Sequence, residues 1–257
     1  MAKTIRVNET PLVLYTLRRA DDALILGHRL SEWCGHAPMM EEDMALANMA
    51  LDLIGQARSL YTYAGEAEGE GRTEDDFAYW RDDRGYRNAL LVEQQNGDFA
   101  RTIMRQFLYA SFADLYWRAM MKSKDETLAA VAAKSEKEMA YHVRHTAEWV
   151  IRLGDGTTES HARIAAALDE LWAYTGELFE MDASEKGLVD AGIAVDLASL
   201  RDQWRANVKA VLEEATLTTP EDGWMQKGGR TGIHSEHLGH LLSDLQHVQH
   251  TIPGAVW

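Results

Sequence analysis

The 257-residue sequence has little cysteine and little proline: Cys34 is its only thiol, and it contains four prolines. One cysteine excludes an internal disulfide and any metal site built from several thiolates of this chain. No stretch reaches the roughly 18 uninterrupted apolar residues of a membrane span, and the first ten residues lack the apolar core of a signal peptide. These absences predict a soluble, cytoplasmic protein.

Positive charge is also scarce. The sequence has 26 Lys and Arg residues against 41 Asp and Glu residues, which gives a net charge of −15. Such a field repels nucleic acid and anionic membranes. We therefore expect neither nucleic acid nor membrane among the partners. The 46% hydrophobic content is enough to fill one sizeable core.

The prolines are placed so that none occurs between residues 39 and 219. The strongest helix breaker is thus missing from most of the chain, which favours long helices. Apolar residues recur at three- and four-residue steps along it. The expected helices cover residues 11 to 34, 41 to 63, a segment starting near Asp98, 125 to 153, 158 to 180, 196 to 215 and 234 to 250.

Residues 64 to 96 differ in character, since they are rich in glycine and acidic residues and then in short aromatic and basic segments. We interpret them as a long connection with helical turns. Two helical hairpins joined by such a crossover are typical of a ferritin-like bundle. The prediction is an all-α, ferritin-like four-helix bundle with additional C-terminal helices. It forms a single domain over 1–257, with a core at about 11–153 and an extension at about 154–257.

Bundles of this shape often hold two iron or manganese ions, using a Glu-x-x-His pair on each of two helices. Three residues make nearly one turn, so the carboxylate and imidazole stand side by side on the inner face. No glutamate of this sequence has a histidine three residues later. The chain is therefore expected to hold no metal or other cofactor of its own.

Several polar residues nevertheless fall on helix faces predicted to point inward. One interpretation makes Asp114, Glu138, His142 and His145 converge on a metal. The alternative pairs each buried polar group with another, Glu138 with His142 for example, because an isolated buried charge is costly. On that second interpretation Tyr141 is a packed aromatic with a bonded hydroxyl. The incomplete inner set comprises Asp52, Asp114, Glu138, Tyr141 and His142.

Three weaker patterns have simpler explanations. One pattern that would suggest a zinc site is the spacing of His234, His237 and His240. Side chains three residues apart occupy gradually shifting positions around a helix, so the three imidazoles need not converge on one ion. Cys34 near His36 lacks a third orienting residue for nucleophilic catalysis. Gly228-Gly229 beside basic residues lacks the spacing of a phosphate-binding loop, so a basic turn is the simpler interpretation.

Arg81, Arg84 and Arg87 recur at steps of three within an otherwise acidic chain. They form either a local anion site or a set of solvated arginines. In the second case their partners would be nearby carboxylates, at Asp75, Asp76, Asp82 and Asp83.

Four long motifs resemble those of a known family. They are Ser31-Glu-Trp-Cys-Gly-His-Ala-Pro38, Ala45-Leu-Ala-Asn-Met-Ala-Leu-Asp-Leu-Ile-Gly-Gln-Ala-Arg58, Leu91-Val-Glu-Gln-Gln-Asn-Gly-Asp-Phe99 and Gly232-Ile-His-Ser-Glu-His-Leu-Gly239. They resemble the C subunits of phenylacetyl-CoA epoxidases, also called 1,2-phenylacetyl-CoA monooxygenases, and the resemblance covers essentially the whole chain.

This resemblance implies a structural subunit that scaffolds a homologous catalytic A subunit, which carries the di-iron centre. The implied complex is a hetero-oligomer, a dimer of heterodimers, with a small B subunit and a reductase that uses FAD, an iron–sulfur cluster and NADPH. It converts phenylacetyl-CoA to its ring epoxide in aerobic phenylacetate catabolism. This chain alone would be inactive.

The resemblance also implies contacts at the edge of the bound acyl-CoA, with no role in bond making. The residues implied are Gly85, Tyr86, Arg87, Asn88 and Lys186. The alternative function is an independent ferritin-like metalloenzyme with an atypical carboxylate and histidine site.

Overall fold

The computed structural model describes residues 4–254, and within that range the regular structure is entirely helical. Four long helices dominate: α1 (Pro11–Ser31), α2 (Met40–Glu68), α5 (Phe99–Met120) and α6 (Glu126–Gly154). Shorter ones are α3 (Glu74–Tyr79), α4 (Leu90–Glu93), α7 (Thr158–Trp172), α8 (Ala183–Asp190), α9 (Arg201–Glu214), α10 (Glu236–Leu245) and α11 (His247–Thr251). In the same range, no helix combines the length and apolar character needed to cross a bilayer.

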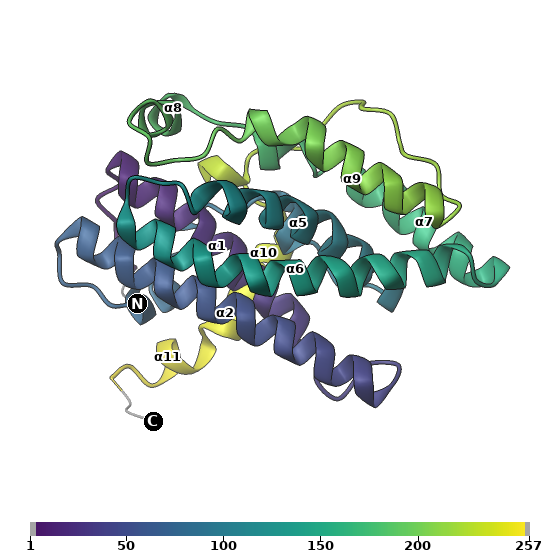
Figure 1. Ribbon diagram of the computed structural model, residues 1–257. Helices are drawn as coiled ribbons and strands as arrows, with labels where there is room; N and C mark the ends of the chain where they lie inside the picture. Colours follow the sequence, from purple (N-terminus) through teal and green to yellow (C-terminus); the bar gives the residue numbers. More distant parts are fainter. Residues whose placement is uncertain (1–3, 255–257) are drawn as a thin grey trace.

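The four long helices form two packed hairpins, α1 with α2 and α5 with α6, and α2 also packs against α6. The crossover between the hairpins contains α3, α4 and the 3-10 turn η1 (Asp83–Gly85). Figure 1 shows the four long helices side by side, with α9 above them. The prediction of an all-α, ferritin-like bundle is confirmed.

Local sequence explains where these helices begin. The Thr10 hydroxyl accepts a hydrogen bond from the Val13 amide, and proline occupies the first turn of α1. Asp98 and Asp125 cap α5 and α6 in the same way, with side chains that accept from backbone amides. A side-chain acceptor at this position satisfies an amide that has no partner within the helix.

The four helices differ in how much of their surface is covered. α6 buries one stripe at three- and four-residue steps, which marks a helix with one face in solvent. α1 buries 16 of its 21 residues, including charged ones, so it is covered on nearly every side. The buried stripe of α6 consists of Leu128, Ala132, Ser135, Met139, His142, Thr146, Val150 and Gly154.

The C-terminal segment packs onto the bundle through apolar contacts. α7 and α9 lie against α5 and α6, and α8 lies against α1. One cluster of buried apolar side chains contains Leu17 and Phe107 of the bundle together with Leu171 and Trp204 of the extension. The sequence-based prediction was a single domain over 1–257, and we propose on this basis that the described residues 4–254 fold as one domain.

α2 extends past the predicted end at residue 63. Residues 65 to 71 were expected to belong to the connection, yet α2 continues to Glu68 and ends at Gly69, whose φ is 77°. A Cβ on Gly65 would lie 2.3 Å from the Arg72 carbonyl oxygen. The glycine at 65 therefore serves close packing inside a helix, which its composition alone does not indicate.

The bounds of the C-terminal helices also differ from those predicted. The helix expected at 158 to 180 ends at Trp172, where the Thr175 hydroxyl donates to the Trp172 carbonyl at 2.8 Å. α8 was not predicted. The helix expected at 234 to 250 begins only at Glu236, because the side chains of His234 and Ser235 bind Glu93 instead.

Candidate functional site

The polar residues at the bundle centre are paired between α2 and α6. Gln56 Nε2 donates to Glu138 at 2.9 Å, and His145 Nε2 lies 2.9 Å from Glu42. The buried His142 bridges Asp52, at 3.2 Å from its Nε2, and Gln106 of α5, at 3.1 Å from its Nδ1. These side chains bind one another along the helix seam and do not converge on one point.

This arrangement does not fit the two-metal centre of ferritin-like enzymes. Such a centre needs several carboxylates and two histidines around one cavity. The inner face presents amides at Gln56 and Gln106, and in residues 4–254 no group of three or more His, Cys, Asp or Glu side chains is arranged to hold a metal ion.

Two expectations for the inner residues were wrong. Glu138 and His142 do not satisfy each other, since Gln56 and Asp52 are their respective partners. Tyr141 is not packed inside, because it is 37% exposed. Asp114 pairs with Arg118 of its own helix at 3.0 Å, in agreement with the interpretation that pairs the inner polar groups.

Two adjacent carboxylates of α1, those of Asp21 and Asp22, are fully buried. Asp21 accepts hydrogen bonds from Arg81 at 2.5 and 3.0 Å and from the Tyr61 hydroxyl at 2.5 Å. Asp22 is bound by Arg230 through two hydrogen bonds of 2.8 Å. Both interpretations of Arg81 were therefore wrong: it is neither solvated nor free for an anion, because its partner is a buried aspartate of α1.

Arg84 and Arg87 of the predicted set remain at a cavity. A cavity of about 530 Å³ is lined by Arg84, Gly85 and Arg87 together with residues 4–7 and Glu9. The Arg87 guanidinium donates to the carbonyls of Arg84 and Tyr86 at 2.6 and 2.9 Å and pairs with Glu9 at 2.6 Å. Its position is thus fixed by the loop that carries it.

Two of the implied acyl-CoA contacts face the interior. Tyr86 is fully buried, with its hydroxyl bonded to the Ala78 carbonyl, and Asn88 is fully buried beside Glu93. Their side chains are not available at the surface. Of the residues implied as acyl-CoA contacts, Gly85, Arg87 and Lys186 therefore remain. Lys186 is exposed on α8 and does not line the cavity beside Arg87.

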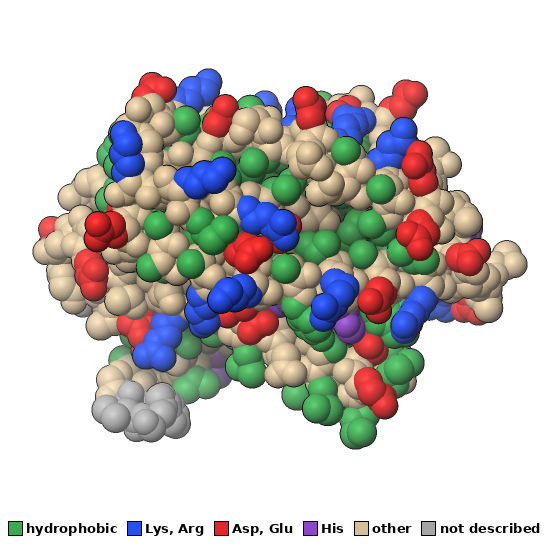
Figure 2. Space-filling view, viewed as in Figure 1, with side chains coloured by type: hydrophobic (Ala, Val, Ile, Leu, Met, Phe, Trp, Pro, Cys, Tyr) green, Lys and Arg blue, Asp and Glu red, His purple; other side chains and the backbone are tan. Residues whose placement is uncertain are grey.

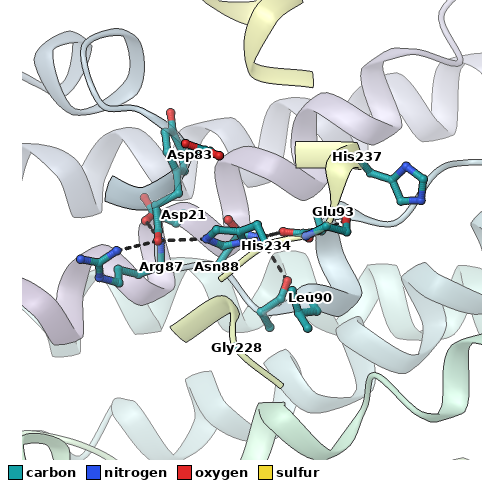
Figure 3. Close-up of polar contacts among 12 residues, drawn as sticks. Asp21, Asp83, Arg87, Asn88, Leu90, Glu93, Gly228, His234 and His237 are labelled. Carbon is teal, nitrogen blue, oxygen red and sulfur yellow. Dashed lines mark hydrogen bonds and ion pairs between the residues drawn. The ribbon is translucent and has the colours of Figure 1, made fainter. Parts of the chain in front are cut away.

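Two buried glutamates that the sequence did not single out hold this loop in place. Glu93 binds Asn88, His234 and Ser235, and Glu177 accepts from the backbone amides of Leu90, Gly228 and Arg230. Figure 3 shows the resulting group, in which the segment around His234 lies against residues 87 to 93. A usable signal was the charge of Glu93 directly after the apolar Leu90-Leu91-Val92.

The remaining patterns have structural explanations. His234 pairs with Glu93 while His250 binds the Tyr79 carbonyl, so the C-terminal histidines are dispersed. Arg230, next to Gly228-Gly229, is buried on Asp22. Cys34 is exposed.

Comparison with known proteins assigns the chain to a family. The model of the family described as "Phenylacetic acid catabolic protein" matches residues 1–257. This chain belongs to that family. It is also 47% identical over 246 residues to the C subunit of the 1,2-phenylacetyl-CoA epoxidase of Escherichia coli (strain K12), covering 96% of this chain and 99% of that protein. The resemblance inferred from the four motifs is thereby confirmed.

Proposed function

We propose that this chain is a non-catalytic structural subunit of a multicomponent phenylacetyl-CoA 1,2-epoxidase. The observation that carries the proposal is the pairing of Gln56 with Glu138 and of His142 with Gln106 and Asp52. Ferritin-like enzymes hold their metals with carboxylates and histidines that project inward from the bundle helices, whereas here such side chains are hydrogen-bonded to one another. The chain keeps the bundle and uses its inner polar groups to join helices.

In this role the chain binds a homologous catalytic A subunit that contains the di-iron centre. A hetero-oligomer of the two, a dimer of heterodimers, works with a small B subunit and with a reductase carrying FAD and an iron–sulfur cluster. The complex uses O2 and NADPH to epoxidise phenylacetyl-CoA, in the cytoplasm. The 47% identity to the C subunit of the Escherichia coli epoxidase supports this assignment.

An apolar face on α2 supports a permanent partner. Met40, Met44 and Leu51 are 72%, 59% and 66% exposed, and they stand on the outer side of the helix. Figure 2 shows apolar side chains gathered at the lower right, over the N-terminal end of α2. We call these three residues the α2 apolar face. Exposed apolar side chains gathered in this way are typical of interfaces between subunits, and the proposed occupant is the A subunit.

The edge of the acyl-CoA is proposed to contact Gly85, Arg87 and Lys186. Arg87 offers a guanidinium, which binds phosphate oxygens in a two-pronged geometry, next to a cavity large enough for a phosphate group. Gly85 gives close access to the backbone there. Binding requires Arg87 to exchange Glu9 for the ligand.

The decisive test separates this proposal from an independent metalloenzyme. The chain is expressed in iron-replete medium, alone and with its A subunit, and bound iron is measured in each preparation. We expect metal only in the preparation that contains the A subunit, together with a stable complex. Near-stoichiometric iron in the chain alone, or failure to form any complex, would overturn the proposal.

A further inference from the structure

His234 connects two segments that lie far apart in the sequence. Its Nδ1 is 2.7 Å from Glu93 Oε2 and its Nε2 is 3.1 Å from the carbonyl oxygen of Tyr86. Its side chain is only 2% exposed, and that of Glu93 is fully buried. The segment around residue 234 is therefore attached to both ends of the loop from Tyr86 to Glu93.

Both partners of the imidazole are acceptors. A carboxylate and a carbonyl oxygen have no hydrogen to give, so each ring nitrogen must carry a proton to complete both hydrogen bonds. A neutral imidazole would complete one of the two and lose the other. With a carboxylate at Glu93, both hydrogen bonds are complete only when the imidazole is charged.

The charged groups around His234 agree with this requirement. Glu93 on α4 and Asp21 on α1 are the negative charges that act on it, and Asp83 and Arg84 of η1 line a cavity of about 520 Å³ beside it. Burial lowers the pKa of His234, but the hydrogen bond and charge of Glu93 outweigh this effect and raise the pKa above its usual value. The charged imidazolium is accordingly more favoured than in a free histidine.

The Tyr86 carbonyl group links His234 to Arg87, because both side chains donate a hydrogen bond to it. Its oxygen accepts from His234 Nε2 at 3.1 Å and from Arg87 Nη1 at 2.9 Å. The neighbouring Gly232, with φ of 78°, lies so close that a Cβ there would be 2.9 Å from Arg87 Nη1. The orientation of the Arg87 guanidinium thus depends on the segment that His234 attaches.

We propose that the His234 imidazolium is a positioning residue, which holds the Tyr86 carbonyl and thereby aims Arg87 at the acyl-CoA. The proposal rests on the proposed function, in which Arg87 meets that ligand. His234 itself touches no reacting atom. Glu93 keeps the imidazole charged and aligned.

The test measures the KM for phenylacetyl-CoA against pH in the reconstituted epoxidase, from about pH 6.5 to about pH 9. In the unmodified enzyme KM should rise with pH as His234 loses its proton. The single amide nitrogen of His234→Gln can replace only one of the two ring nitrogens. This variant should raise KM about tenfold at neutral pH, leave kcat nearly unchanged and flatten the pH profile. Glu93→Gln should move the rise in KM to lower pH.

His240→Gln is the matched control, because His240 is an exposed histidine of the neighbouring α10. It should leave KM and its pH profile unchanged. If His234→Gln assembles normally and behaves like this control, the proposal is overturned. A fall in kcat alone, with KM constant, would also overturn it.

Hydrogen exchange separates failure of this inference from failure of the proposed function. The full chain is compared with His234→Gln, alone and in the complex, and exchange of the amides at residues 84–88 is followed. Faster exchange in the variant supports the positioning role, even if Arg87→Ala shows that Arg87 does not contact the acyl-CoA. Unchanged exchange would overturn the positioning role whatever the kinetics of Arg87→Ala.

Discussion

The carboxylate of Asp21 and the guanidinium of Arg81 form a two-bonded ion pair inside the protein, with distances of 2.5 and 3.0 Å. Both side chains are almost completely buried, and 60 residues separate them in the chain. Asp21 also accepts from the backbone amide of Arg87 at 2.7 Å. The Asp21 carboxylate thereby holds both ends of the segment from Arg81 to Arg87, which contains the proposed ligand contacts Gly85 and Arg87.

Replacing Arg81 tests how much this pair matters. Arg81→Leu leaves the Asp21 carboxylate buried without its cation, so the free energy of unfolding should fall by about 3–5 kcal/mol in urea titrations. Arg58→Leu is the control, because the Arg58–Glu74 pair of 3.1 Å lies at the surface. The control should lose less than about 1 kcal/mol. Equal losses in the two variants would contradict the assignment.

Arg87 is expected to act through affinity for the acyl-CoA. Arg87→Ala in the reconstituted epoxidase should raise the KM for phenylacetyl-CoA about tenfold with little change in kcat, since a charged hydrogen bond to phosphate is lost. Arg87→Lys keeps the charge and should recover part of the affinity. Arg58→Ala, at a different cavity, should have no effect. An unchanged KM in Arg87→Ala would remove this contact and leave the scaffold role untouched.

The buried His28 should make the free energy of unfolding depend on pH in the acidic range. Burial lowers the pKa of His28 to about 4 from the usual 6.5. Between about pH 6.5 and 4, His28 is therefore protonated in the unfolded chain but neutral in the folded chain. The free energy of unfolding should fall as the pH is lowered through this range, by up to about 3 kcal/mol. His28→Gln should lose this part of the acid sensitivity in urea titrations at several pH values. The exposed His240→Gln should retain it, and identical curves for both variants would refute the assignment to His28.

The α2 apolar face should be needed for assembly. The double variant Met44→Glu, Leu51→Glu places two charges on it and should prevent co-purification with the A subunit, because a buried unpaired charge is costly at an interface. The variant itself should fold, since both positions are solvent-exposed in the isolated chain. Trp224→Glu is the matched control, another exposed apolar residue but on the segment between α9 and α10. If the double variant still binds the A subunit as the control does, the partner uses another face.

Sequence patterns located the four long helices, but they missed the end of α2 and the bounds of the short helices. The ranges predicted for α1, α5 and α6 follow from apolar spacing and from capping residues such as Asp98 and Asp125, which act within one turn. The end of α2 and the breaks after Trp172 and before Glu236 depend on distant partners. The close approach of Arg72 to Gly65 and the attraction of His234 to Glu93 are examples.

The same division applies to the candidate site. The sequence by itself determined the fold class, the family and the lack of Glu-x-x-His, because each of these is carried by local spacing or by long motifs. Tertiary structure alone decided which charges meet: Arg81 with Asp21, Arg230 with Asp22 and His234 with Glu93. A buried charge takes whichever opposite charge the folded chain brings within a few ångströms, and sequence distance carries no information about that choice.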